Sequence, residues 1–180
     1  LEVLEQSSVN FPKGVKYTTL INANDFLTES ISKVISTLME AFLLVFIVVF
    51  IFLQDWRSTL IPAISVPVAI VGTFFFLSLF GFTINLLTLF ALVLAVGIVV
   101  DDAIVVVEAV HAKMEAGEHD PKKAAHSAMG DISGAIISIT LVMSAVFIPV
   151  SFISGPTGVF YREFSLTMAV SIVLSGVIAL

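Results

Sequence analysis

Two adjacent carboxylates inside a long apolar run are the most distinctive chemical feature of this sequence. Asp101 and Asp102 interrupt the run from residue 84 to residue 107, past its midpoint. An acidic side chain at the centre of a lipid-facing helix costs about 2.5–3.5 kcal/mol on insertion scales. We therefore expect both side chains to face a protein interior or a water-filled path, and not lipid.

An acidic pair in such a place can handle protons. Burial disfavours an ionised carboxylate, a second carboxylate nearby adds to that effect, and a cationic neighbour opposes it. A pair held between these influences can bind and release protons near physiological pH. If access alternates between the two sides of the membrane, such a pair couples proton flow to conformational work. The membrane potential supplies about 2.3 kcal/mol per charge per 100 mV.

The surroundings of the pair in the sequence support this interpretation. Gly97 lies four residues before Asp101 and so shares its helical face, where a glycine would let another helix approach the carboxylate closely. Two other interpretations stay open: the pair is structural, or the span ends at Val100 and the aspartates lie at the membrane interface. The apolar continuation from Ala103 to Val107 argues against the interfacial position.

The other polar residues in the apolar runs predict packing and not chemistry. Asn85 and Thr88 are candidates for hydrogen bonds between helices. Ser138, Thr140 and Ser144 are further candidates of the same kind. Contacts of this type are common between membrane helices.

The sequence offers no motif for a metal, a nucleotide or a covalent intermediate. It has no cysteine, which excludes disulfides and thiolate metal sites. It has no phosphate-binding loop of the G-x-x-x-x-G-K-[ST] type, no nucleophile elbow and no metalloprotease motif. His111, His119 and His126 lie in a polar stretch, match no metal motif and are interpreted as surface residues. We therefore expect a transporter and not an enzyme, without metal or cofactor, with protons as the coupling ion.

The composition points to a lipid bilayer. Of the 180 residues, 58% are hydrophobic and 12% are charged, whereas a soluble domain is about 45–50% apolar and about 25% charged. A soluble fold of this size could not bury so much apolar surface, but hydrocarbon can surround it. The net charge of −6 gives no support to nucleic-acid binding. We predict an all-α, polytopic membrane protein.

Five apolar runs are long enough to form a bundle of transmembrane helices, since hydrocarbon about 30 Å thick is crossed at about 1.5 Å per residue. They predict helices at about 31–53, 59–80, 84–107, 132–153 and 162–180, with a polar connector at 108–131. The connector is expected to contain a short amphipathic helix that begins at Pro121.

Residues 1–30 are polar and predict a short extramembrane segment that completes a water-exposed domain. Alternating residues at 15–19 suggest a short strand, and Asn24 or Asp25 is a candidate helix cap. Both ends of the sequence look cut, so we interpret the chain as part of a longer protein.

The basic residues of the loops predict the orientation of the spans. Arg57 and three lysines favour a cytoplasmic location for the turn at 54–58 and the connector at 108–131. The turn at 81–83 has no basic residue, and the loop at 154–163 has only Arg162. Residues 1–30 would then lie outside the cytoplasm.

The run from Gly97 to Glu108 closely resembles the fourth transmembrane helix of the resistance-nodulation-division exporters, especially those of the AcrB type. Residues 52–62 resemble that family's passage from helix two to helix three. Parts of the stretch from Pro67 to Asn85 resemble its third helix and the turn into the fourth. Residues 144–149 and 155–158 resemble helix five and the loop after it.

The resemblance covers nearly the whole chain and implies that the five runs are helices two to six. Residues 1–30 would complete the first periplasmic porter region. Asp101 and Asp102 would form the proton relay, whose partner lysine belongs to a later helix outside this chain. Metal-exporting relatives usually lack the second carboxylate, so Asp102 favours the exporters of hydrophobic and amphiphilic small molecules, the drug and detergent pumps.

The resemblance also implies a cellular setting and partners. The family works as a homotrimer in the lipid of the bacterial inner membrane, with a periplasmic membrane-fusion adaptor and an outer-membrane channel. Three alternatives stay open: a metal-ion or protein-secretion relative, a non-transporting receptor of the sterol-sensing kind, and a membrane-embedded aspartyl protease. The paired aspartates of such proteases normally come from different helices, which argues against the last.

Overall fold

The computed structural model describes residues 11, 12, 14, 16 and 23–180. Over this part of the chain the elements are α2 (Ala23–Leu53), α3 (Trp56–Leu79), α4 (Leu86–Glu115), α5 (Pro121–Val150) and α6 (Pro156–Ala179). The described residues form no strand, and all five helices are long and apolar enough to cross a membrane. The predicted all-α fold with five membrane-spanning helices is confirmed for these residues. The strand expected at 15–19 lies largely outside them.

The helices reach further than the apolar runs from which they were predicted. Helix α2 begins eight residues before residue 31, at Ala23, and α4 continues past residue 107 to Glu115. The connector expected at 108–131 is therefore mostly helical, with a turn that includes Gly117 at φ 108°. The short separate helix expected at Pro121 is the first part of α5. An apolar run marks only the part suited to hydrocarbon, whereas backbone hydrogen bonding continues until a turn residue stops it.

Side-chain caps explain why α3, α4 and α5 begin where they do. Asp55 accepts hydrogen bonds from the backbone N–H groups of Arg57 and Ser58, and Asp120 accepts one from Lys122. Asn85 caps α4 in the same way. Such caps satisfy backbone donors that the first turn of a helix leaves unpaired.

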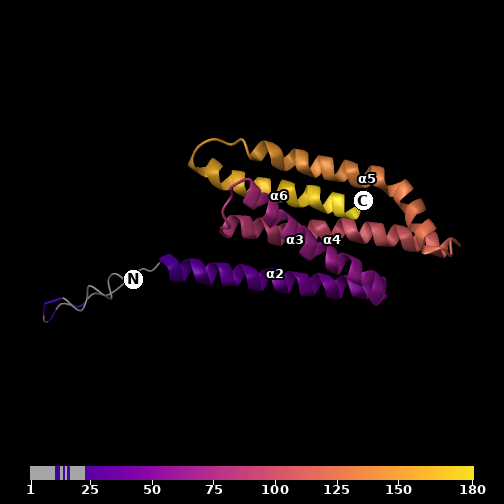
Figure 1. The fold of residues 1–180 in the computed structure, drawn as a ribbon, viewed down its shortest axis with the longest axis horizontal. Coiled ribbons are helices and arrows are strands. Elements are labelled where there is room, and N and C mark those ends of the chain that lie inside the picture. Colours follow the sequence, from indigo (N-terminus) through magenta and orange to yellow (C-terminus); the bar gives the residue numbers. More distant parts are fainter. Residues whose placement is uncertain (1–10, 13, 15, 17–22) are drawn as a thin grey trace.

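Helix α4 is the centre of the bundle and contacts each of the other four helices. In Figure 1, α2 runs along one edge and α5 along the other, with α4 and α6 between them and α3 crossing obliquely. Half of the most apolar window of α4 is buried, compared with 11% of that of α2. Small residues line the contact with α6, where Ala91 and Ala95 pack against Met168 and Ile172. Such residues let membrane helices approach closely.

Polar contacts join the helix ends at the two ends of the bundle. At one end, the side chain of Asn85 donates a hydrogen bond to Glu163 of α6. At the other, Lys113 of α4 forms an ion pair with Asp131 of α5, 2.6 Å between Nζ and Oδ2. Successive loops therefore alternate between the ends, as the orientation prediction requires. Which end faces the cytoplasm stays a prediction.

Candidate functional site

Helix α4 carries the acidic pair near its middle. Its start is fixed by Asn85, whose side-chain oxygen accepts from the N–H groups of Leu87 and Thr88 at 2.9 and 3.0 Å. Asp101 then lies 15 residues after Leu86, or about 22 Å along the axis at about 1.5 Å per residue. The helix is 30 residues long, so the carboxylates are remote from both of its ends.

Asp102 is buried in the contact between α4 and α6. Its side chain is 8% exposed, and Ser175 on α6 is 2% exposed. The Ser175 hydroxyl donates a hydrogen bond to Oδ2 of Asp102 at 2.5 Å. Because a buried polar group is costly unless it is hydrogen-bonded, this contact is a main reason that Asp102 can lie between two apolar helices.

Asp101 lies on a different side of α4 and is exposed. Asp101 and Asp102 both line an open groove of about 330 Å³ between α4 and α5. The rest of the lining is mainly apolar, including Ile98 and Ile104 of α4 and Ile139 and Met143 of α5. Successive side chains on a helix point about 100° apart, which is why Asp101 is exposed in the groove whereas Asp102, which also lines it, is buried against α6. The adjacent carboxylates of Asp101 and Asp102 thus extend from the accessible groove to the buried contact between α4 and α6.

Gly97 lies beside Asp101 in the same groove. A Cβ atom at Gly97 would meet no atom within 4 Å. Within the described residues no helix therefore makes the close approach expected there. The packing role of Gly97 stays a prediction.

Asn85 and Thr88 take part in the cap of α4. The Thr88 hydroxyl accepts from the backbone N–H of Asn85 at 2.9 Å, which closes a capping box. Asn85 also makes the bond to Glu163 on α6. Asn85 thus joins two helices, whereas the hydrogen bonds of Thr88 stay within its own cap.

Three hydroxyl residues of α5 differ in their surroundings. Ser138 donates to the backbone oxygen of Gly134 at 2.7 Å. The hydroxyl oxygens of Thr140 and Ser144 are buried without a hydrogen-bond partner among the described residues. Thr140 packs directly against Gly176 of α6.

Ser175 and Glu163, which contact Asp102 and Asn85, were not among the site residues predicted from the sequence. A signal for Ser175 was present, because Thr167, Ser171 and Ser175 follow one another at intervals of four residues. That spacing places them on one face of α6, and all three are buried.

The histidines lie at or near the end of the bundle that holds the turn between α4 and α5. The Nε2 atom of His111 is 3.4 Å from the hydroxyl of Ser58, and His119 and His126 are exposed. Nearby, the Ser58 hydroxyl and the backbone N–H of Arg57 donate to Asp55 and hold the pKa of that carboxyl below its usual value. No cluster of three or more potential metal ligands occurs in the region that the structure describes.

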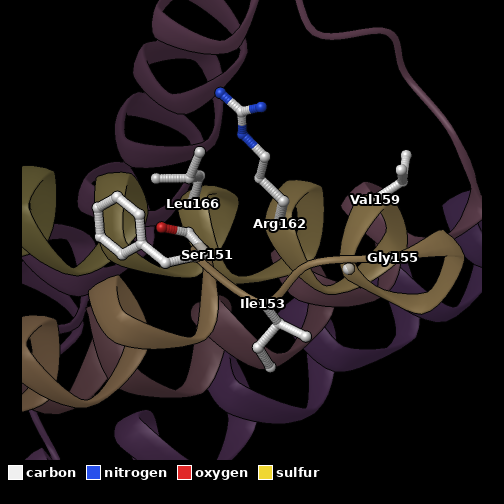
Figure 2. Close-up of a pocket in the computed structure, with 8 residues that line it drawn as sticks. Ser151, Ile153, Gly155, Val159, Arg162 and Leu166 are labelled. Atoms are coloured by element: carbon white, nitrogen blue, oxygen red, sulfur yellow. The ribbon is translucent and has the colours of Figure 1, made fainter.

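A larger hollow of about 580 Å³ lies away from the acidic pair, at the loop between α5 and α6 (Figure 2). Its lining includes Ser151, Ile153, Gly155 and Leu166, and Arg162 is its one charged residue. The Arg162 side chain extends away from the α6 ribbon in Figure 2. The hollow contains no carboxylate, so it is separate from the acidic site in position and in chemistry.

The fold and the site together define a multi-pass membrane protein whose central helix carries a half-buried acidic pair. The sequence model of the AcrB/AcrD/AcrF family matches residues 1–180, and the chain belongs to this family. The resemblance to resistance-nodulation-division exporters of the AcrB type is thereby confirmed.

Individual relatives agree with the family match. The chain is 48% identical over 179 residues to the multidrug resistance protein MdtF of Escherichia coli (strain K12), covering 99% of this chain and 17% of that protein. It is 48% identical over 170 residues to the multidrug export protein AcrF of the same strain, covering 94% and 16%. It is 49% identical over 170 residues to the toluene efflux pump membrane transporter TtgB of Pseudomonas putida, also covering 94% and 16%. The chain thus spans 16–17% of the length of these curated relatives.

Proposed function

We propose that the chain is part of a proton-driven multidrug efflux transporter, a proton/drug antiporter of the bacterial inner membrane. One observation carries the proposal: the middle of the central helix places two adjacent carboxylates on one open groove, and the second, Asp102, is at the same time buried against α6. Charged groups at such depth are costly in a membrane protein and mark ion pathways. Asp101 and Asp102 are the relay residues in this proposal.

The groove supports a division of roles between the two carboxylates. Asp101 is exposed in the groove and can exchange protons with water or with a cationic side chain placed there. Asp102 is buried, so its protonation changes the charge inside the contact between α4 and α6. The open space beside Gly97 leaves room for a helix from the rest of the protein. The family's partner lysine would enter at this point.

The relatives support the choice of cargo and partners. Their names describe multidrug resistance, multidrug export and toluene efflux. We therefore extend to this protein the export of hydrophobic or amphiphilic small molecules. A homotrimer, a periplasmic membrane-fusion adaptor and an outer-membrane channel complete the proposed assembly.

Replacing each acid in the full-length protein tests the proposal. Asp101→Asn and Asp102→Asn are each expected to abolish proton-dependent export from cells, because an amide keeps the shape of the carboxylate but cannot exchange a proton. Glu108→Gln is the matched control, since Glu108 is an exposed acid seven residues after Asp101 on the same helix. Membrane expression and trimer formation are measured in parallel. Continued export by both aspartate variants, at wild-type expression, would refute the relay.

A further inference from the structure

Two described hydroxyl groups of α6 contact other helices: Ser171 Oγ lies 3.0 Å from Thr73 Oγ1 of α3, and Ser175 forms a hydrogen bond with the carboxylate of Asp102. Ser165, Thr167 and Ser171 each donate to a backbone oxygen of α6 itself, Thr167 at 2.6 Å and Ser171 at 2.8 Å. Ser175 follows Thr167 and Ser171 at the same interval of four residues, but its hydroxyl donates to Asp102 of α4. Its partner is 73 residues away in the sequence and is one of the two membrane carboxylates.

Helix α6 is held in place at the residue after Ser175. A Cβ atom at Gly176 would collide with Oγ1 of Thr140 in α5, and the Cγ2 and Cβ atoms of Thr140 lie 3.1 and 3.2 Å from its position. Helix α6 thus meets α5 without a gap at Gly176 while it faces α4 at Ser175. Ser175, the residue before Gly176, therefore belongs to a closely packed and buried part of α6.

Asp102 has few charged or hydrogen-bonding neighbours among the described residues. The titratable residue beside it is Asp101, on its own helix. Helices α2, α3, α5 and α6 bring no charged side chain to it within the described residues. Ser175 is the one described side chain that forms a hydrogen bond with it.

We propose that Ser175 is a positioning residue that lets Asp102 change its protonation state without losing its buried hydrogen bond. The inference rests on the proposed relay function. A hydroxyl both donates and accepts, unlike an ammonium or guanidinium group. When Asp102 is ionised, the Ser175 O–H donates to Oδ2, as observed. When a proton binds Oδ2, the new O–H donates to Ser175 Oγ.

The hydroxyl hydrogen of Ser175, which no longer bonds to Asp102, then has another acceptor within reach. In the protonated state it turns to the backbone oxygen of Ser171, four residues earlier. Ser171 and Thr167 already use the oxygens four residues before them in this way. Both protonation states are therefore hydrogen-bonded, and the proton enters and leaves Asp102 without an unpaired polar group in the contact.

The test uses the full-length pump in proteoliposomes, with export driven by an imposed pH gradient and measured across a series of pH values. Ser175→Ala removes the donor that stabilises the ionised carboxylate, so the protonated form persists to higher pH. We expect the midpoint of the pH profile to move up by about one pH unit, the size expected for one hydrogen bond to a charged group. Ser175→Thr keeps the hydroxyl and is expected to restore the wild-type midpoint.

Ser165→Ala is the matched control, because Ser165 is a buried serine of the same helix that donates to its own backbone. It is expected to leave the midpoint unchanged. A wild-type midpoint in Ser175→Ala would overturn the inference, as would an equal shift in Ser165→Ala. If Ser175→Ala does not assemble, infrared titration of the protonated carboxyl band in Ser175→Thr and wild type decides. The inference would also be overturned if the titration midpoints or the carboxyl band positions differed widely between Ser175→Thr and the wild type.

Failure of this inference differs from failure of the proposed function. If Asp102→Asn abolishes export but Ser175→Ala keeps the wild-type pH profile, the relay stands and the role of Ser175 falls. If Asp101→Asn and Asp102→Asn both export normally, the relay itself falls, and the role of Ser175 falls with it.

Discussion

Asn85 stabilises the protein in two ways, as the cap of α4 and as a hydrogen-bond donor to α6, and mutations can separate the two contributions to the free energy of unfolding. Asn85 caps α4 through its side-chain oxygen and donates to Glu163 through its side-chain nitrogen. Loss of an asparagine cap costs about 1 kcal/mol. A hydrogen bond to a charged group contributes about 1.5–3 kcal/mol. Both residues are half-buried, so Asn85→Ala is expected to lower the free energy of unfolding by about 2.5–4 kcal/mol.

Two further variants separate the cap from the contact. Asn85→Asp keeps the cap, because aspartate is an equally good cap residue, but it places a second carboxylate against Glu163. We expect it to lose the contact with α6 and to add repulsion. Combining Asn85→Asp with Glu163→Gln reverses the polarity of the pair, because the glutamine amide then donates to the aspartate. The double variant is therefore expected to recover most of the loss.

The assay is a denaturing-detergent titration of the purified full-length protein, which gives a free energy of unfolding for each variant. The interaction energy follows from the double-mutant cycle of Asn85 and Glu163. The reasoning is refuted if Asn85→Asp unfolds like the wild type, since the contact would then contribute nothing. It is also refuted if the double variant is no more stable than Asn85→Asp alone.

Two more predictions concern packing and pH. Gly176→Ala should lower the free energy of unfolding in the same titration by about 1–3 kcal/mol, because the added Cβ atom collides with Thr140. Gly134→Ala is the control and should cause no loss of stability, because a Cβ atom at Gly134 meets no atom within 4 Å. The pKa of Asp55 is lowered in the fold, chiefly by the Ser58 hydroxyl. The ionised Asp55 carboxylate therefore stabilises the fold at pH values above about 3.9, the pKa of an aspartate in an unfolded chain. This stabilisation is lost as the pH falls below that value. Unfolding midpoints from pH 7 down to pH 3 should therefore decline less in Asp55→Asn than in the wild type, and an equal decline would contradict the assignment.

Local features of the sequence were enough to predict the spans and the acidic pair. The apolar runs identify membrane helices because hydrocarbon excludes unpaired polar backbone over a fixed thickness. Asp101 and Asp102 stand out for the same reason, since charge at that depth is costly. Helix ends were less predictable: α4 passes residue 107 and reaches Glu115. Beyond the hydrocarbon, helix length depends on caps and turns and not on apolar content.

Only the tertiary structure decided which faces meet. The sequence places Asp101 and Asp102 about 100° apart, but the packing of α6 on α4 determines that Asp102 is the buried one. The sequence drew attention to Gly97, yet the close contact between α5 and α6 is at Gly176, on another helix. The partner of Asp102 is a serine 73 residues away. A helical period fixes the angles between side chains on one helix, whereas the rotation of each helix is set by the joint packing of all its neighbours.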